Sequence, residues 1–209
     1  MYKVYGDTKS GNCYKIKLLL HFLGMQYEWV HIDILAGDTR SAKFKAMNKN
    51  TKIPVLEIEQ AEYLCESNAI LNFLAEGSSF LPEAGIQRAK VLQWQFFEQY
   101  SHEPNIAVAR FINKYLGLPE DKKEDYASKQ EGGHKALAVM EEQLSESTFL
   151  VGESATIADI SLYAYTHVAH EGGFDLEQYP NIQLWLSRIE ALPNYVGMNV
   201  GMNVGMNEL

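Results

Sequence analysis

Cysteine is scarce in this sequence: Cys13 and Cys65 are the only two among 209 residues. Such a chain is a poor candidate for the disulfide frameworks that stabilise small secreted domains. The sequence also has no apolar run near the roughly 20 residues that cross a bilayer, and residues 1–11 lack the apolar segment typical of a signal peptide. We therefore expect a cytoplasmic protein with no membrane partner.

Positive charge is limited and unevenly placed. The chain has 18 Lys and Arg against 27 Asp and Glu, for a net charge of −9. Residues 1–77 hold nine basic and nine acidic residues, so the whole excess of negative charge follows them. An acidic chain without a basic stripe is a poor nucleic-acid binder, and we expect no such partner. The asymmetry indicates two units, of which the neutral first one could still receive a small anion.

Sequence motifs for several common chemistries are also missing. There is no G-x-S-x-G nucleophile elbow, no G-x-x-x-x-G-K-[ST] phosphate loop and no H-E-x-x-H zinc motif. The spacing of His167, His170 and Glu171 could suggest a metal, but no further ligands are in view. We expect these side chains to have a structural role at a helix end, and we predict neither a metal site nor a tightly bound cofactor.

The first part of the chain alternates between strand-like and helix-like segments. The pattern predicts strands at 2–5, 27–34, 53–59 and 62–65, and helices at 11–24, 39–48 and 67–76. The order β-α-β-α-β-β-α implies parallel pairing of the early strands and an antiparallel edge.

The second part shows no convincing strand. Its apolar spacing predicts helices at 86–115, 121–145 and 181–192, and we expect Pro104 to kink or break the first of them. Thr156 and Asp159 form a capping box ahead of the apolar run ISLYAY, which marks the start of a buried helix.

These patterns divide the chain into an α/β domain at 1–77, a linker at 78–85 and an all-α domain at 86–195. The remaining residues, 196–209, contain the tetrapeptide VGMN three times. Three such short copies cannot form a solenoid. We therefore expect 196–209 to be a loose tail. Three of the seven methionines lie in it, which leaves a partner-binding tail as the alternative.

The residues SGNC, at 10–13, lie between the first predicted strand and the first predicted helix. A Cys-x-x-Cys at such a turn is a redox motif, but here Ser10 replaces the first cysteine. A helix N-terminus favours negative charge, so a hydroxyl there suits a thiolate that a ligand brings. Lowering a thiol pKa from ~8.5 to ~6.5 needs roughly 2.7 kcal/mol, and one hydrogen bond to a charged group supplies ~1.5–3 kcal/mol. The simpler alternative is that Ser10 only caps the helix.

Two further dipeptides carry similar information. Ile53-Pro54 opens a predicted strand, where a cis peptide bond would leave the backbone of Ile53 to pair with an extended peptide. Glu66-Ser67 opens a predicted helix, where Ser67 could hold a carboxylate and Glu66 an ammonium group. The alternatives are an ordinary trans proline and a simple N-cap. The three features are much more specific together than each is alone.

The stretches SGNCYKIK, NTKIPVLEI and CESNAILNFLA, with the TIADISLYAY box, resemble the cytosolic-type glutathione S-transferases over about residues 1–195. The chain looks closest to serine-type bacterial and theta-, delta- or zeta-like members. The resemblance implies a thioredoxin-like N-terminal domain, an all-helical C-terminal domain, a homodimer and a role in detoxification with glutathione as co-substrate.

The resemblance also implies positions for glutathione. Glu66 and Ser67 would hold its γ-glutamyl group, and the backbone of Ile53 would pair with its cysteine. Lys52 would lie near the glycyl carboxylate or the ligand backbone.

Two residues compete for the thiol of glutathione. Ser10 matches the catalytic serine of the family, whereas some bacterial classes use a residue two positions later, which here is Asn12. Asn12 and Lys15 form an N-x-x-K pattern that resembles nu-like members. We expect Cys13, which matches the resolving cysteine of a redox motif, to face inward and react poorly.

The second substrate would bind against the helical part. By resemblance, His102 and Arg110 lie where family members often line that pocket, although both could equally be solvated helix residues. The predicted activity is conjugation of glutathione to an electrophilic, mostly apolar small molecule. A glutathione-dependent isomerase, a disulfide-bond reductase and a non-catalytic dimerisation or stress-response module remain open alternatives.

Overall fold

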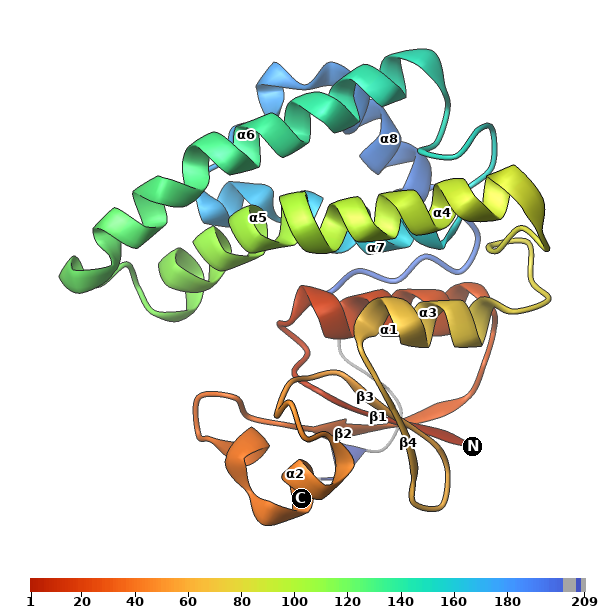
Figure 1. The fold of residues 1–209 in the computed structure, drawn as a ribbon, viewed down its shortest axis with the longest axis vertical. Helices are drawn as coiled ribbons and strands as arrows, with labels where there is room; N and C mark the ends of the chain where they lie inside the picture. The colour runs from red at the N-terminus through yellow and green to blue at the C-terminus, as the bar shows by residue number, and fades with distance from the viewer. Residues whose placement is uncertain (201–205, 208–209) are drawn as a thin grey trace. The chain divides into compact units, whose positions relative to one another are not determined.

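In the computed structural model, residues 1–200 and 206–207 are described, and 201–205 and 208–209 are not. The chain forms two compact units (Figure 1). The first unit consists of Met1–Ser78 together with Pro193–Leu209, and the second consists of Ser79–Leu192. No helix in the described part of the chain is long and apolar enough to cross a membrane.

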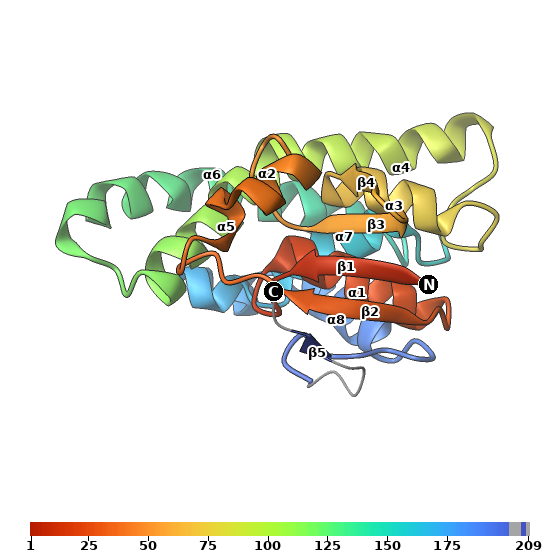
Figure 2. The same ribbon diagram turned by 90° about the horizontal axis from the view of Figure 1, so that it is seen from below.

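The first unit contains a mixed sheet. Its strands are β1 (Tyr2–Gly6), β2 (Tyr27–His31), β3 (Val55–Glu59), β4 (Glu62–Cys65) and β5 (Met206–Asn207), in the order β4-β3-β1-β2-β5 (Figure 2). β1 is parallel to β2 and antiparallel to β3, which pairs antiparallel with β4. The predicted thioredoxin-like order is confirmed. The short β5, which is parallel to β2, was not predicted.

Helices cover both faces of this sheet. α1 (Gly11–Phe22) and α3 (Ser67–Ala75) lie on one face, and α2 (Ala42–Met47) lies on the other (Figure 1). On the α2 side, Phe44 and Met47 pack into an apolar core with side chains from the strands and their ends, namely Tyr5, Val30, Ile32 and Val55. α1 is buried almost all round, including at Lys15 and Lys17, so it is a core helix and not a surface one.

The start of the tail is not loose, which corrects the prediction for residues 196–200. Lys17 Nζ donates to the carbonyl oxygens of Gly197, Met198 and Val200 at 3.2, 3.3 and 2.8 Å. Tyr14 Oη donates to Val196 O at 2.8 Å, and Met198 is buried. A buried lysine must find hydrogen-bond acceptors, and this segment supplies them as backbone carbonyls. Of the later copies, residues 201–205 lie outside the described residues.

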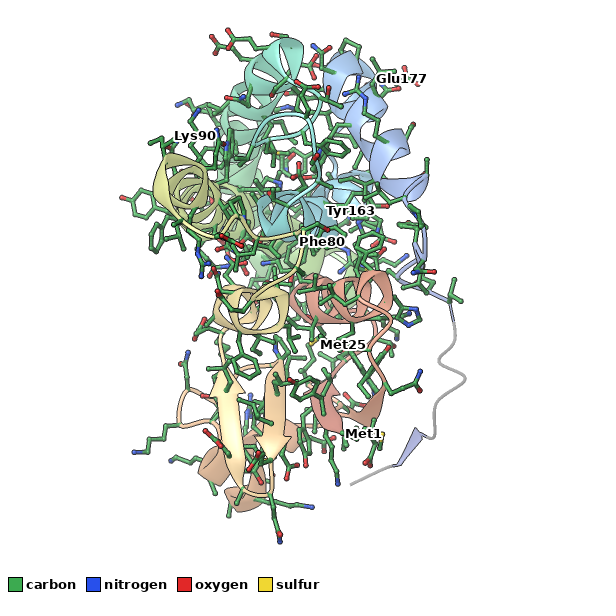
Figure 3. The ribbon with its side chains drawn as sticks, turned by 90° about the vertical axis from the view of Figure 1, so that its right-hand side faces the viewer. Met1, Met25, Phe80, Lys90, Tyr163 and Glu177 are labelled. Carbon is green, nitrogen blue, oxygen red and sulfur yellow. The ribbon has the colours of Figure 1, made fainter. Side chains whose placement is uncertain are left out.

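The second unit is helical, as predicted. Its α-helices are α4 (Gly85–Phe97), α5 (Glu103–Arg110), α6 (Lys123–Glu146), α7 (Ile157–Thr166) and α8 (Pro180–Glu190), with short helical turns η2 (Glu98–His102), η3 (Phe111–Tyr115), η4 (Glu120–Lys122), η5 (Ala169–Gly172) and η6 (Leu176–Gln178). Every residue of α7 is buried. Figure 3 shows Tyr163 of α7 within this unit, and its side chain is fully enclosed.

The predicted capping box opens α7. Asp159 Oδ2 accepts from Thr156 N at 2.8 Å, and the Thr156 side chain accepts from the first turn of the helix. The other carboxylate oxygen accepts from Leu150 N and from Trp185 Nε1, each at 2.9 Å. Asp159 therefore joins α7 to α8 as well as capping α7.

Pro104 does not break the helix, contrary to one outcome expected from the sequence. α4 continues through a π-helical turn, η2, into α5, and Pro104 lies in the first turn of α5. The backbone N–H of Glu103 donates to Glu98 O, five residues earlier. The widened turn provides room for a proline ring that would clash in a regular α-helix.

Candidate functional site

The strand register brings the three predicted features to one end of the sheet. Tyr5 of β1 pairs with Val55 of β3, and Val55 pairs with Cys65 of β4. The chain continues from β1 to the SGNC turn, enters β3 from Pro54 and leaves β4 into Glu66. The SGNC turn, Pro54 and Glu66 therefore lie at the same end of the sheet, although more than 50 positions separate the first from the last in the sequence.

Ser10 caps α1 at this edge. Its Oγ accepts from Cys13 N at 3.4 Å, and its backbone N–H donates to Asp7 O at 3.1 Å. Capping uses an oxygen lone pair, so the hydroxyl proton remains able to donate to another acceptor. The first turn of α1 contains no acidic side chain, which keeps this helix N-terminus attractive to an anion. The capping role and the predicted thiolate role are therefore compatible.

Cys13 faces the sheet, as expected. Its side chain is fully buried, and a Cβ added to Gly6 would lie only 2.7 Å from Cys13 Sγ. Gly6 is therefore required for close packing of α1 on β1. Burial raises the pKa of the Cys13 thiol to about 12, in spite of the lowering effect of the hydrogen bond with Ser10. This thiol stays protonated at neutral pH and is a poor nucleophile.

The N-terminus of α3 contacts the first turn of α1 through Ser67. Ser67 Oγ donates to Asn12 Oδ1 at 3.2 Å, and Lys15 Nζ donates to Ser67 Oγ at 3.3 Å. Ser67 and Lys15 are buried, and Asn12 is half-buried. The structure thus brings together Ser67 and Asn12, which the resemblance places at the γ-glutamyl end and at the thiol end of glutathione. In the sequence, the position of Lys15 among apolar residues of α1 is the signal for its burial.

Glu66 precedes α3 in a strained conformation. Its φ of 69° and ψ of 114° are unfavourable for a residue with a side chain. The Glu66 side chain is exposed beside the buried Ser67. Strain of this kind persists where the surroundings impose it, and it is concentrated at binding sites. The position is therefore consistent with an exposed carboxylate held ready for a cationic group.

The peptide bond between Ile53 and Pro54 is cis. Pro54 is buried, Ile53 is half-buried and Lys52 is exposed. Asn48 Nδ2 donates to Lys52 O at 2.8 Å and fixes the chain that leads into this bond. The cis bond that the sequence suggested is confirmed. It directly precedes Val55, the residue of β3 that pairs with Tyr5 and Cys65.

His102 and Arg110 are enclosed in the helical unit. His102 is fully buried, with Nε2 2.9 Å from Thr166 Oγ1. Arg110 is 5% exposed and forms an ion pair of 2.7 Å with Glu171, which also pairs with Lys114 at 3.2 Å. Because both side chains are bound to structural partners, we do not include them among the proposed substrate contacts.

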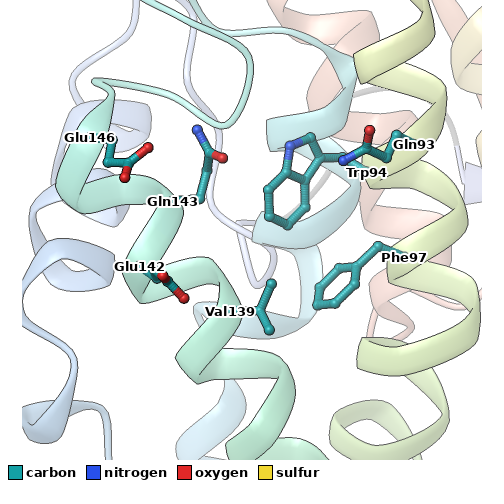
Figure 4. Close-up of a pocket in the computed structure, with 7 residues that line it drawn as sticks. All are labelled: Gln93, Trp94, Phe97, Val139, Glu142, Gln143 and Glu146. Carbon is teal, nitrogen blue, oxygen red and sulfur yellow. The ribbon is translucent and has the colours of Figure 1, made fainter.

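A groove of about 340 Å³ lies between α4 and α6 (Figure 4). Trp94 and Phe97 of α4 face Val139 of α6 across it, with Glu142 and Glu146 farther along α6. None of the predicted site residues lines this groove. Among the described residues, no group of three or more His, Cys, Asp or Glu side chains could hold a metal ion.

Comparison with known families identifies both units. Residues 1–76 match the model of the glutathione S-transferase N-terminal domain, and residues 95–193 match that of the C-terminal domain. A solved structure of a glutathione S-transferase from Pseudomonas fluorescens [Pf-5] is 63% identical, with a TM-score of 0.93, and the match covers 95% of this chain and 98% of that one. The chain belongs to the glutathione S-transferase family.

More distant relatives in this family have different names. The probable maleylacetoacetate isomerase of Vibrio cholerae is 25% identical over 92% of both chains. The disulfide-bond oxidoreductase YfcG of Escherichia coli is 28% identical, over 90% of this chain and 89% of its own length. Family membership therefore identifies a glutathione transferase in the general sense and leaves the particular reaction to be argued from the site.

Proposed function

We propose that the protein binds glutathione at the edge where β1, β3 and β4 meet α1 and α3, and activates its thiol for conjugation. The observation that carries this proposal is the Tyr5–Val55–Cys65 register, because it gathers the SGNC turn, the cis-Pro54 bond and the Glu66-Ser67 pair. A scaffold without a ligand would need none of these features at one place.

The proposed ligand lies across this edge. Its γ-glutamyl group meets Glu66 and Ser67, with the exposed Glu66 carboxylate opposite the ammonium group. The backbone of its cysteine pairs with the backbone of Ile53, which precedes the cis bond. Its glycyl carboxylate lies near the exposed Lys52, and its thiol reaches the first turn of α1.

The proposed reaction is nucleophilic attack by the glutathione thiolate. The thiol proton passes to solvent, a carbon–sulfur bond forms, and the leaving group of the electrophile departs with the electron pair of its broken bond. The Ser10 hydroxyl donates to the sulfur, and the N-terminus of α1 adds its positive potential. Asn12 is the second donor. Preorganised donors favour the thiolate because they do not have to reorient when the charge forms.

Calorimetric titration with glutathione and S-methylglutathione tests the proposal, together with an absorbance assay on an activated aryl chloride. We expect binding of both ligands and conjugation that increases with pH until the bound thiol is ionised. N-acetylglutathione, which lacks the ammonium group, should bind more weakly because Glu66 loses its partner. Absence of heat with all three ligands would show that the proposal is wrong.

A disulfide-bond reductase is the second candidate, and the relationship to YfcG favours it. In that reaction two glutathione molecules would reduce one substrate disulfide to two thiols and become glutathione disulfide. The buried Cys13 makes a protein-bound disulfide intermediate at the SGNC turn unfavourable. Rapid turnover of a mixed disulfide with little conjugation would favour this candidate. Turnover of maleylacetoacetate without net loss of glutathione would instead indicate an isomerase.

We propose further that the protein is a cytoplasmic homodimer with a role in detoxification. An apolar stripe on α4 and η2 supports the dimer: Leu92, Phe96 and Tyr100 are 37%, 70% and 88% exposed and lie four residues apart. Such a stripe is costly to leave in water and suits a second copy of the chain. Sedimentation analysis of Phe96→Glu should show a shift towards monomer, whereas an unchanged mass would argue against this face.

A further inference from the structure

We propose that Lys15 is a positioning residue, which acts through Ser67 to set the orientation of the Asn12 amide at the thiol end of the site. The inference rests on the proposed glutathione function and adds a residue to it. Its basis is a chain of two hydrogen bonds, from Lys15 Nζ to Ser67 Oγ and from Ser67 Oγ to Asn12 Oδ1.

The location of Lys15 makes such a role possible. Asn12 and Lys15 are three residues apart on α1 and therefore share one face of the helix. That face meets the start of α3, where Ser67 is 6% exposed and Lys15 is fully buried. An ammonium group can only donate hydrogen bonds, so Ser67 Oγ must be the acceptor of this contact. The hydroxyl proton of Ser67 is then directed to its other neighbour, Asn12.

The same logic fixes the amide of Asn12. A side-chain amide has an accepting and a donating side, and the hydrogen-bond network decides which way it faces. Because Ser67 donates to Oδ1, the orientation of the amide is set and Nδ2 is its donating side. A thiolate requires a donor, so this orientation is the useful one. Without Lys15, the Ser67 hydroxyl could rotate and accept a hydrogen bond from Asn12 Nδ2. The Asn12 amide would then be flipped, with Oδ1 on its other side.

The chain also couples the two ends of the proposed ligand. Ser67 lies where the γ-glutamyl group is expected, and Asn12 lies in the turn that is expected to receive the thiol. The one proton of the Ser67 hydroxyl goes to Asn12, so we expect the γ-glutamyl carboxylate to accept from the backbone N–H groups at the start of α3.

The test is the bound-thiol pKa, read from thiolate absorbance with saturating glutathione. We expect Lys15→Met to raise this pKa by about one unit, the size of one lost hydrogen bond to a charged group. Lys15→Arg keeps a cationic donor and should restore most of the shift. Lys17→Met is the matched control: Lys17 is also a buried lysine of α1, but it contacts the tail, and its loss should leave the bound-thiol pKa unchanged.

A double-mutant cycle with Asn12→Ala separates positioning from a general loss of structure. If Lys15 acts through Asn12, Lys15→Met should have little further effect on the bound-thiol pKa once Asn12 is alanine. Additive shifts, or an unchanged pKa in Lys15→Met with only a higher KM for glutathione, would overturn the inference. Failure of the wild-type protein to bind glutathione would appear before any variant is made, and it would overturn the proposed function itself.

Discussion

Two buried lysines on α1 serve regions of very different character. Lys15 lies against the hydroxyl of Ser67, in a group of side chains that we assign to ligand binding. Lys17, two residues later, donates to three backbone carbonyls of the tail segment 196–200. The first region contains hydroxyl, amide and carboxylate side chains and a strained backbone, whereas the second contains backbone acceptors and a buried methionine. Burial of a charged residue therefore indicates a functional group only when its partners are functional.

The tail side should contribute mainly to stability. Lys17→Met removes the donor for three carbonyls, and at ~1 kcal/mol for each hydrogen bond it should lower the free energy of unfolding by about 3 kcal/mol. Urea unfolding measures this loss. Removal of residues 196–209 should have an effect of similar size, and the two changes together should be far from additive because they break the same contacts. Simple additivity would show that Lys17 does not act through the tail.

In the proposed glutathione site, a substitution can stabilise the fold and still weaken function. Glu66→Gly relieves the positive φ and should raise the free energy of unfolding by ~1 kcal/mol relative to Glu66→Ala, which keeps the strain. Both variants lose the carboxylate and should raise the KM for glutathione alike. Thermal unfolding and initial rates are the two measurements. Equal stability of the two variants would mean that the conformation of Glu66 carries no strain.

The smallest expected effect is a dependence on pH. Burial lowers the pKa of Lys17 from its ordinary value of 10.5, so between the two values the unfolded chain binds more protons than the folded one. Stability due to this group should therefore increase as the pH rises towards 10.5. Urea unfolding of wild type and Lys17→Met at pH 7, 8.5 and 9.5 measures the difference. A gap between the two proteins that narrows with pH would contradict the expected sign.

The sequence was sufficient to predict the order of strands and helices along the first unit, except for β5, and the three features at one end of the sheet. Most of these have a strong local cause: alternation in the strands, proline at the start of β3, and Ser10 as the N-cap of α1. Ser67 is not such a cap, because it is the first residue of α3 and Glu66 holds the N-cap position without a side-chain bond. The capping box of Thr156 and Asp159 was equally local. Such signals need only a few neighbouring residues, so they can be recognised without knowledge of tertiary contacts.

Long-range contacts accounted for what the sequence did not predict. Lysines are normally exposed, and nothing next to Lys17 in the sequence indicates that residues 196–200 return to it. The contact between Ser67 and Asn12 joins residues 55 positions apart and depends on how α3 packs on α1. The turn around Pro104 depends on a change in helical hydrogen bonding that proline allows but does not require. His102 and Arg110 were assigned by resemblance, and their actual partners lie on segments that follow α6.

The central claim is that Ser10 stabilises the thiolate of bound glutathione, and one titration tests it most directly. The bound-thiol pKa is measured in wild type, Ser10→Ala and Ser41→Ala, where Ser41 caps α2 by the same kind of bond, accepting from Phe44 N at 3.2 Å. Both variants should lose about 1 kcal/mol of stability. We predict that only Ser10→Ala raises the bound-thiol pKa, by ~1–2 units. The claim would be contradicted if the bound-thiol pKa stayed low in Ser10→Ala and rose to that of free glutathione in Asn12→Ala. That result would assign the role to Asn12.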